Sequence, residues 1–549
     1  MRFVCVLSLV ALAPSTALAC GGFFCSTQPI EQSAERIVFG VDAQDGTIET
    51  HVQIAYQGTA EDFAWVVPVP AIPDLFLSTD TLFQSLSSRT QPRFFLDARY
   101  DGQCEFDGCG TFGAGCFAEA DAGSNSNANG GDDGVTVVAE ENVGPYDTVT
   151  LQADSAELLL TWLQDNGYQL PDTLMPVLEP YVMASTYFVA LRLSQNEGVG
   201  DLAPLGMRYA AATPMIPIQL TSIAASPDMR LEVYVLGEAR AVPDNYLHVQ
   251  INEAAIDWFT GGRNYNDVIT RAADEAGGQA FATDFAGTTE SLGAFLFAEG
   301  RFDTGALAQQ SDPAAFVDGL LSQGFPRNTQ MQGLLRKYIP MPAELVEDGV
   351  DERDFYNCLR CYSEALGSIV FDPVAFAAEL EERVVAPLRD AQATFDRLPY
   401  LTRLTSSVSP EEMTVDPTFV FNRELGDLDN VRRATLIYEC GAGTKLSEAQ
   451  RRIELSDGTV IRLEPEATLF AAGQSSSDAI SDLEAPAAAV IEQTGADGLP
   501  TTLEDNRPEI AARVDQHNND VPRFEASGGT CAATPPSLLL LLLLRRRRS

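Results

Sequence analysis

The clearest residue pattern with chemistry of its own is CLRC, in which Cys358 and Cys361 lie three positions apart at the start of an expected helix. Two thiols at this spacing can form a reducible disulfide of the kind that thiol oxidoreductases use. No βαβ unit precedes the pair and no strand with a neighbouring cis-proline can be identified, so a structural disulfide is the preferred interpretation. A zinc site would need a second ligand pair of matching spacing, which the sequence lacks.

Histidine, the usual general base near neutral pH, occurs three times. His51 and His248 fall on the polar faces of alternating strands, and His517 falls in an expected linker. We interpret each as a hydrogen-bonded or solvated side chain. The sequence contains no HExxH zinc motif, GxSxG nucleophile elbow or phosphate-binding loop. Carboxylate pairs for glycoside hydrolysis stay open, because 78 acidic residues make chance pairings common. The catalytic residues of any enzyme activity are therefore unknown at this level.

Calcium is the one cofactor that the sequence suggests. DAQDGTIE, residues 42–49, imitates part of a calcium-binding loop, and NGGDDG, residues 129–134, clusters oxygen ligands with glycines. Neither segment has the complete series of ligands closed by a bidentate acid. We therefore expect a hairpin turn and a solvated loop, respectively, and no metal site.

The charge balance argues against one class of partner. The chain of 549 residues contains 35 basic and 78 acidic residues, which gives a formal net charge of −43 at pH 7. Such a surface repels polyanions, so we expect no nucleic-acid binding and no direct attraction to anionic lipid. An acidic, solvated surface suited to salty surroundings accounts for the composition.

The N-terminus predicts export. Arg2 precedes the apolar run FVCVLSLVALA, and Ala17 and Ala19 are small residues at the positions that a signal peptidase reads. We predict a signal peptide over residues 1–19 and a mature chain that begins at Cys20. The alternative is a lipoprotein with a diacylglycerol on Cys20, although Ala17 stands where such signals usually have leucine.

The cysteines fit an exported protein that is held by disulfides. Of the ten, Cys5 leaves with the signal peptide and Cys531 lies near the C-terminus. The even number in the body predicts up to four disulfides, whose pairing cannot be deduced, although Cys20 and Cys25 could close a tight loop across CGGFFC. The eight candidates are Cys20, Cys25, Cys104, Cys109, Cys116, Cys358, Cys361 and Cys440.

The elements that would position these residues begin with strands. TIETHVQIAYQ, residues 47–57, alternates apolar and polar residues, and together with ERIVFGVD before it and Asp45-Gly46 between them it predicts a β-hairpin. DFAWVVPVP is predicted to end at a sheet edge, because proline donates no ladder hydrogen bond. Further strands are predicted at TYFVALRL, IPIQLTSI, MRLEVYVL and YLHVQIN, with few helices between them, which favours antiparallel pairing.

Helical periodicity follows the first strands and then dominates. Asp154 is predicted to cap the helix SAELLLTWLQDNG, and NYNDVITRAADEAGG repeats the pattern. From about residue 303 to 400 the apolar period is helical, and Asp312-Pro313 and Asp372-Pro373 are predicted helix starts. Strand patterns return at TFVFNRE, RRATLIYEC and GTVIRLEP.

These patterns predict an α+β fold, with a mostly antiparallel β unit and a helical unit inserted or appended. Residues 472–530 are rich in Ala, Asp, Ser and Gln and are predicted to be a disordered linker. The predicted organisation is a signal peptide (1–19), a mainly antiparallel β unit with helices (20–300) that includes a disulfide-tethered loop insertion (101–134), a mainly helical unit (301–410), a returning β segment (411–471), the linker (472–530) and a C-terminal sorting tail (531–549).

Four segments, ACGGFFC, AERIVFGVD, AEDFAWVVPVP and LTRLTSSVSPEEMTVDPTFVFN, resemble the domain-of-unknown-function 2330 family of exported bacterial proteins. The resemblance runs over most of residues 19–440. That family has no assigned activity, ligand or catalytic residue, so the resemblance implies export and no particular chemistry.

The tail CAATPPSLLLLLLLRRRRS separately resembles the C-terminal sorting signals of myxobacteria, which combine a cysteine after small residues, an apolar run and an arginine cluster. The resemblance implies that an intramembrane protease cuts near Cys531, which then carries the surface anchor. The run is shorter than in those signals: a helix of seven leucines covers about 10 Å of a hydrocarbon core about 30 Å thick, so it cannot span a bilayer.

The sequence therefore predicts an exported protein of the cell envelope or cell surface that contacts the membrane only through its C-terminal tail or the lipid on it, after handling by export and sorting machinery. We expect a non-enzymatic binding or structural module whose ligand is unknown. The alternatives are an extracytoplasmic hydrolase that uses carboxylates and a thiol oxidoreductase that uses Cys358 and Cys361. A deep cleft with converging acidic residues would favour the hydrolase, whereas a shallow surface would favour binding.

Overall fold

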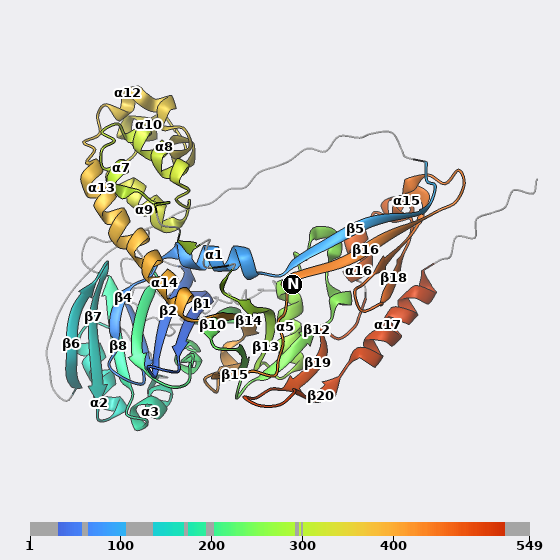
Figure 1. Ribbon diagram of the computed structural model, residues 1–549, viewed down its shortest axis with the longest axis horizontal. Helices are drawn as coiled ribbons and strands as arrows, with labels where there is room; N and C mark the ends of the chain where they lie inside the picture. Colours follow the sequence, from blue (N-terminus) through green and yellow to red (C-terminus); the bar gives the residue numbers. More distant parts are fainter. Residues whose placement is uncertain are drawn as a thin grey trace, which may run out of the picture.

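A computed structural model describes residues 31–57, 64–105, 135–168, 174–193, 203–290, 292, 296–297, 300–481 and 483–521. Its centre is a ten-stranded sheet (Figure 1). In spatial order the strands are β20 (Thr501–Asp505), β19 (Ala488–Gln493), β12 (Leu247–Ile251), β13 (Ala280–Thr288), β14 (Tyr400–Val408), β10 (Ala225–Gly237), β1 (Glu31–Asp42), β2 (Thr47–Gln57), β9 (Leu205–Ala210) and β4 (Asp74–Leu77). Pairing is antiparallel except between β1 and β10 and between β12 and β13. The predicted α+β class with mostly antiparallel strands is confirmed.

The hairpin predicted around Asp45-Gly46 is present as β1 and β2. Gly46 has a φ of 66°, a conformation that glycine adopts without steric cost. The Asp42 carboxylate accepts hydrogen bonds from the backbone N–H groups of Gln44 and Asp45, at 3.0 and 3.2 Å. The calcium-like segment DAQDGTIE thus includes an Asx-type turn, as expected.

A second sheet packs on one face of the first. Its strands are β3 (Ala64–Val69), β8 (Tyr187–Leu193), β7 (Tyr146–Ala153) and β6 (Val135–Val143), with β3 at the edge. The edge position predicted for the proline-containing strand is confirmed. Val67 and Val189 share a buried cluster with Phe39 of β1, while Phe188 faces Leu159 on the other side. Helices α2 (Ala156–Asp165) and α3 (Met175–Met183) cover that outer side.

Two local predictions here are wrong. The cap of α2 is Ser155, whose extended backbone lets its hydroxyl accept from Leu158 N–H at 3.2 Å, and not Asp154. The segment IPIQLTSI contains the short helix α4 (Ile218–Thr221) in place of a strand. Pro217 explains the second error, because it has no N–H for a strand ladder and its fixed φ suits a helix start.

The helical stretch predicted from about 303 to 400 is present and forms a lobe beside the sheet (Figure 1). It consists of α7 (Thr304–Leu307), α8 (Pro313–Gln323), α9 (Thr329–Tyr338), α10 (Ala343–Glu347), α11 (Glu352–Asn357), α12 (Ser363–Leu366), α13 (Pro373–Leu380) and α14 (Ala386–Arg397). Asp312 and Asp372 cap α8 and α13 as predicted. With α1 (Asp80–Thr90), α14 joins this core to the sheet, because Leu388 packs in one cluster with Leu82 and Val38.

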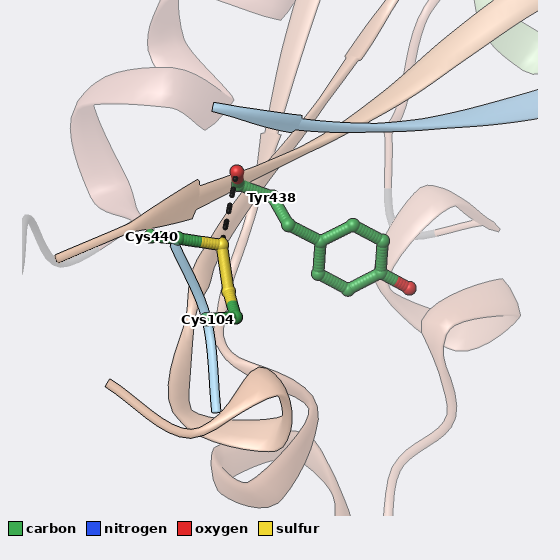
Figure 2. The surroundings of a disulfide bond; sticks show 3 residues. All are labelled: Cys104, Tyr438 and Cys440. Atoms are coloured by element: carbon green, nitrogen blue, oxygen red, sulfur yellow. Dashed lines mark hydrogen bonds between the residues drawn. A yellow bond between two sulfur atoms is a disulfide. The ribbon is translucent and has the colours of Figure 1, made fainter. Parts of the chain in front are cut away.

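A third sheet extends away from the body as an arm (Figure 1). It is formed by β18 (Val460–Leu463), β17 (Gln450–Glu454), β16 (Val431–Cys440) and β5 (Arg93–Gly102), and β16 pairs with β5 in parallel. At its far end the Cys104–Cys440 disulfide joins the two parallel strands, beside Tyr438 (Figure 2). The Tyr438 ring stacks on Tyr100 with centroids 5.3 Å apart. The remaining pair of strands, β11 (Arg240–Pro243) and β15 (Phe419–Asn422), is antiparallel.

The prediction of a disordered linker at 472–530 is wrong for the residues described up to 521. This segment contains α16 (Ser476–Ser481), β19, β20 and α17 (Arg507–Asp520), which follow α15 (Glu466–Ala471). In β19, Val490 and Ile491 are buried, and in α17 Ile510 and Val514 are buried one turn apart. Both elements therefore complete cores built by earlier residues, although the local composition carries little apolar periodicity.

Candidate ligand-binding cavity

A cavity of about 890 Å³ lies where the C-terminal part of the ten-stranded sheet faces the base of the arm; we call it the inter-sheet cavity. Ligand pockets are commonly about 300–1,000 Å³, so a small molecule would fit. Phe94 of β5 and Val249 of β12 belong to its apolar wall. Its ionisable and hydroxyl-bearing lining residues include Arg240, His248, Glu253, Tyr265, Thr283, Asp284, Asp429, Arg432, Arg433, Ser456 and Glu492.

Three of these side chains form a continuous hydrogen-bonded chain across neighbouring strands. The Thr283 hydroxyl is 2.9 Å from His248 Nε2, and His248 Nδ1 is 2.8 Å from the Glu492 carboxylate. His248 on β12 lies directly opposite Glu492 on β19, so the two side chains share a face of the sheet. Gln250 donates to the second oxygen of Glu492 at 3.2 Å. All three members of the chain are buried within the protein yet line the inter-sheet cavity.

The ionisation of Glu492 fixes the direction of these hydrogen bonds. Burial alone would raise the pKa of Glu492, but the hydrogen bond and charge of His248, together with the Gln250 amide, hold it below its usual value. An ionised carboxylate only accepts hydrogen bonds, so His248 Nδ1 carries a proton toward it. In neutral His248, Nε2 then accepts from the Thr283 hydroxyl.

The strand ladders are irregular at the cavity. The pairing register shifts between Gln250 and Ile251, between Ile491 and Glu492, and between Thr283 and Phe285. Bulges of this kind redirect side chains and are over-represented next to active sites. Here they occur in three strands that supply the cavity wall.

A buried ion cluster lies beneath the cavity. Asp284 accepts hydrogen bonds from the hydroxyls of Tyr265 and Thr405, and Arg403 Nε lies 3.1 Å from the same carboxylate. Burial raises the pKa of Asp284 in spite of the opposing charge of Arg403. Arg403 also lies 3.4 Å from Glu232. This cluster fixes Tyr265 and Asp284, which line the cavity.

Arg240 presents unused hydrogen-bonding capacity. Its Nη1 donates to the Gly426 carbonyl at 3.3 Å, whereas its buried Nε has no acceptor among the described residues. Burial lowers the pKa of Arg240, while Glu492 is among the groups whose charge opposes that shift. The other two arginines of the lining have carboxylate partners: Arg432 lies 3.4 Å from Glu253, and Arg433 lies 3.1 Å from Asp97.

The histidines are all hydrogen-bonded, consistent with the sequence interpretation. Besides His248, His51 contacts Ser78 at 2.8 Å and Glu49 at 3.1 Å. His517 lies on α17, where its Nε2 is 2.8 Å from the Arg462 carbonyl, so its assignment to a linker was incorrect.

The structure places the predicted cysteines as far as they are described. Cys104 pairs with Cys440 and Cys358 pairs with Cys361, so a disulfide within CLRC is present. The CLRC pair lies in the helical lobe and contributes nothing to the cavity lining. Ala19, Cys20, Cys25, Cys109, Cys116 and Cys531 lie outside the described residues, as does NGGDDG. Within the described ranges, no group of His, Cys, Asp or Glu is arranged to hold a metal ion.

The two disulfides are expected to differ in their contribution to stability. Cys104–Cys440 closes a sequence separation of 336 residues and Cys358–Cys361 one of three. A disulfide that closes a long loop lowers the entropy of the unfolded chain more than one that closes a short loop. The resulting stabilisation of the folded protein reaches about 5 kcal/mol for long loops. Replacing both Cys104 and Cys440 with alanine should therefore lower the urea midpoint clearly. The matched pair of alanines at 358 and 361 should change it little, and the reverse order would contradict this account.

Sequence reasoning missed the cavity because its key residues are far apart in the chain. Thr283 and Glu492 lie 35 and 244 positions from His248. The available signal was the alternation in YLHVQIN, which placed His248 on a polar face without indicating its partners.

Comparisons with known proteins give one match. No curated protein and no solved structure is significantly similar to the chain. The family model described as "Uncharacterized protein conserved in bacteria (DUF2330)" matches residues 14–294. The matched region includes His248 and Thr283, and Glu492 comes from beyond it. Since the match covers half of the chain, the protein belongs to the DUF2330 family of uncharacterized bacterial proteins.

Proposed function

We propose that the protein is an exported envelope module that binds a small ligand with an acidic group in the inter-sheet cavity. The observation that carries the proposal is Arg240, whose side chain lines a cavity large enough for a ligand and whose buried Nε has no acceptor among the described residues. Guanidinium groups bind carboxylate and phosphate oxygens through charge-assisted hydrogen bonds. An acidic ligand would complete the hydrogen bonding of Arg240.

The rest of the lining restricts the ligand further. Because Arg432 and Arg433 already face carboxylates, Arg240 is the arginine with capacity to spare. Glu253, Asp429 and Glu492 also line the cavity, and their charges would repel a polyanion. A monocarboxylate, or a molecule that carries both an amine and a carboxylate, fits this mixture better than a nucleotide or a polyphosphate.

We propose a location in the cell envelope on the basis of the termini. The signal peptide at residues 1–19 would direct export, and processing near Cys531 would leave the protein on the surface, with lipidation of Cys20 as the alternative anchor. The two disulfides are consistent with an oxidising compartment. Of the helices described here, none has the length and apolar character needed to cross a bilayer.

Ligand binding can be tested with Arg240→Met. We would screen the secreted protein by thermal shift and calorimetry against acetate, butyrate, free amino acids and N-acetylated dipeptides. Removing a charge-assisted hydrogen bond costs about 1.5–3 kcal/mol, so affinity should fall about 10- to 100-fold. Arg423→Met is the matched control, because Arg423 is exposed, pairs with Glu238 and does not line the cavity. Equal affinity of wild type and Arg240→Met would contradict the proposal.

A hydrolase is the second candidate, and one observation favours it. The cavity brings together the carboxyl groups of Glu253, Asp284, Asp429 and Glu492, and converging acidic residues are what a hydrolase that uses carboxylates requires. The thiol oxidoreductase alternative gains no such support, because Cys358 and Cys361 lie in the helical lobe, away from this cavity.

A further inference from the structure

We infer that Thr283, His248 and Glu492 form a nucleophile, base and orienting acid that hydrolyse esters of small carboxylic acids in the inter-sheet cavity. The inference rests on the proposed ligand cavity and assigns it a reaction. In this reaction the nucleophile is a hydroxyl group, whereas the hydrolase considered above would use a pair of carboxylates.

The geometry matches the requirements of nucleophilic catalysis. A weak hydroxyl nucleophile must lie within about 2.6–3.2 Å of a base, and a third group must orient that base. Thr283 and His248 are 2.9 Å apart, and His248 and Glu492 are 2.8 Å apart. Register shifts occur at Glu492, where β19 pairs with β20, and directly after Thr283, where β13 pairs with β14, whereas His248 and Glu492 are opposite each other in regular register.

A second hydrogen-bonded chain of a hydroxyl, an imidazole and a carboxylate shows what distinguishes this one. Ser78, His51 and Glu49 are also hydrogen-bonded in that order, but none of them lines the inter-sheet cavity. Ser78 is 1% exposed, and Glu49 is further bound by Arg208 and Thr394. That chain satisfies buried polar groups within the fold. The Thr283 chain differs in two ways: its hydroxyl contacts Nε2 and its carboxylate contacts Nδ1, the reverse of the Ser78 chain, and its members line a cavity.

The proposed reaction uses only an ester and water. Thr283 Oγ1 attacks the ester carbonyl carbon while its proton passes to His248 Nε2, and the imidazolium is stabilised by ionised Glu492. The carbon–oxygen bond to the alcohol breaks, and His248 returns the proton to the departing alkoxide. Water then attacks the acyl-threonine by the same route, which releases the carboxylic acid and regenerates the Thr283 hydroxyl.

Arg240 indicates the preferred substrate class. Its guanidinium is part of the cavity lining and has the Gly426 carbonyl as its acceptor, so it would attract a carboxylate on the acyl part of the ester, and half-esters of dicarboxylic acids are the expected substrates. The probe is therefore the mono-p-nitrophenyl ester of succinic acid, compared with p-nitrophenyl acetate, which has no second carboxylate. The charged ester should have a kcat/KM at least 10-fold higher.

The experiment follows p-nitrophenol release and intact mass in the exported full chain. Removing the nucleophile in Thr283→Val should lower kcat/KM at least 100-fold, the scale of general-base catalysis, and abolish an acyl adduct on the peptide that contains residue 283. Thr283→Ser should restore both. Ser78→Ala is the matched control: it removes the corresponding hydroxyl of the second chain and should leave turnover unchanged.

Binding of unreactive succinate separates the possible failures. Suppose that wild type and Thr283→Val bind succinate equally well, but that neither the wild type nor any variant shows turnover or an acyl adduct. The proposed roles of Thr283, His248 and Glu492 in catalysis are then overturned, and the binding cavity stands. If the wild type shows no turnover and binds neither succinate nor any of the monocarboxylates and amino acids of the Arg240 screen, the cavity proposal fails as well. Turnover that persists in Thr283→Val also overturns the proposed roles of these three residues. A melting temperature for each variant confirms that it is folded.

Discussion

Replacing Arg403 with methionine is expected to lower the free energy of unfolding by about 3–5 kcal/mol, because it leaves buried carboxyl groups without their cation. Arg403 is 4% exposed and lies 3.4 Å from Glu232 and 3.1 Å from Asp284. Its guanidinium also lies 5.5 Å from the centre of the Tyr234 ring. Methionine retains most of the volume, so the loss would report charge more than packing.

The state of Glu232 explains why the loss should be large. Burial would raise the pKa of Glu232, but the charges of Arg403, Arg36 and Arg230 hold it below its usual value. Glu232 is therefore ionised in the folded protein, and removing Arg403 takes away its strongest electrostatic partner. Part of the compensation would remain, because Arg36 lies 3.1 Å from Glu232.

Urea unfolding at pH 7, followed by circular dichroism, measures the effect of Arg403→Met. The control is Arg423→Met, which breaks an exposed pair with Glu238 and should leave the free energy of unfolding almost unchanged. Glu232→Gln and the double variant complete a double-mutant cycle. Glu232→Gln should lower the free energy of unfolding less when Arg403 has already been replaced. A loss below about 1 kcal/mol for Arg403→Met would contradict the role assigned to the cluster.

Local patterns were sufficient where the residues that define an element are neighbours in the chain. The hairpin at Asp45-Gly46 and the caps at Asp312 and Asp372 depend on adjacent residues, and all three were predicted correctly. The helix predicted in NYNDVITRAADEAGG is present as α5 (Tyr265–Glu275), which buries Val268, Ile269, Ala272 and Ala273 on one face.

Elements that depend on distant partners were not predictable in the same way. β19 is a strand because it pairs with β12, more than two hundred positions earlier, and its alanine-rich sequence gives little local indication of this. The cavity adds a second condition, since His248 acquires its chemistry only when β13 and β19 place Thr283 and Glu492 beside it. A polar residue on an alternating strand can face either solvent or buried polar partners. The alternation alone did not distinguish these for His51, which has buried partners in Ser78 and Glu49.

The C-terminal tail should decide where the protein is found, because its leucine run is too short for a permanent span. Seven leucines cover about 10 Å as a helix, against a hydrocarbon core of about 30 Å. The four arginines that follow would stay on the cytoplasmic side and halt export. The pause would present Cys531 near the outer face of the membrane for cutting and lipidation.

The expected result is that Cys531→Ala removes the protein from the cell surface, either into the medium or into the inner membrane. Thr534→Ala is the control, because it changes a neighbouring residue and leaves the cysteine in place. Since one acyl chain binds a membrane only reversibly, stable anchoring needs two chains or a second contact. Cys20→Ala tests whether a lipid on Cys20 supplies this second contact. The same variant tests whether that lipid is the whole anchor.

Mass spectrometry of the C-terminal peptide of surface protein distinguishes the outcomes. A mature end at or near Cys531, with the mass of a lipid on the cysteine, supports processing followed by anchoring. An intact LLLLLLLRRRRS on protein at the surface contradicts it, because a cleaved signal cannot remain attached. Loss of surface protein in Cys20→Ala, with Cys531→Ala unaffected, would assign the anchor to the N-terminus and leave the arginine cluster without the role proposed for it.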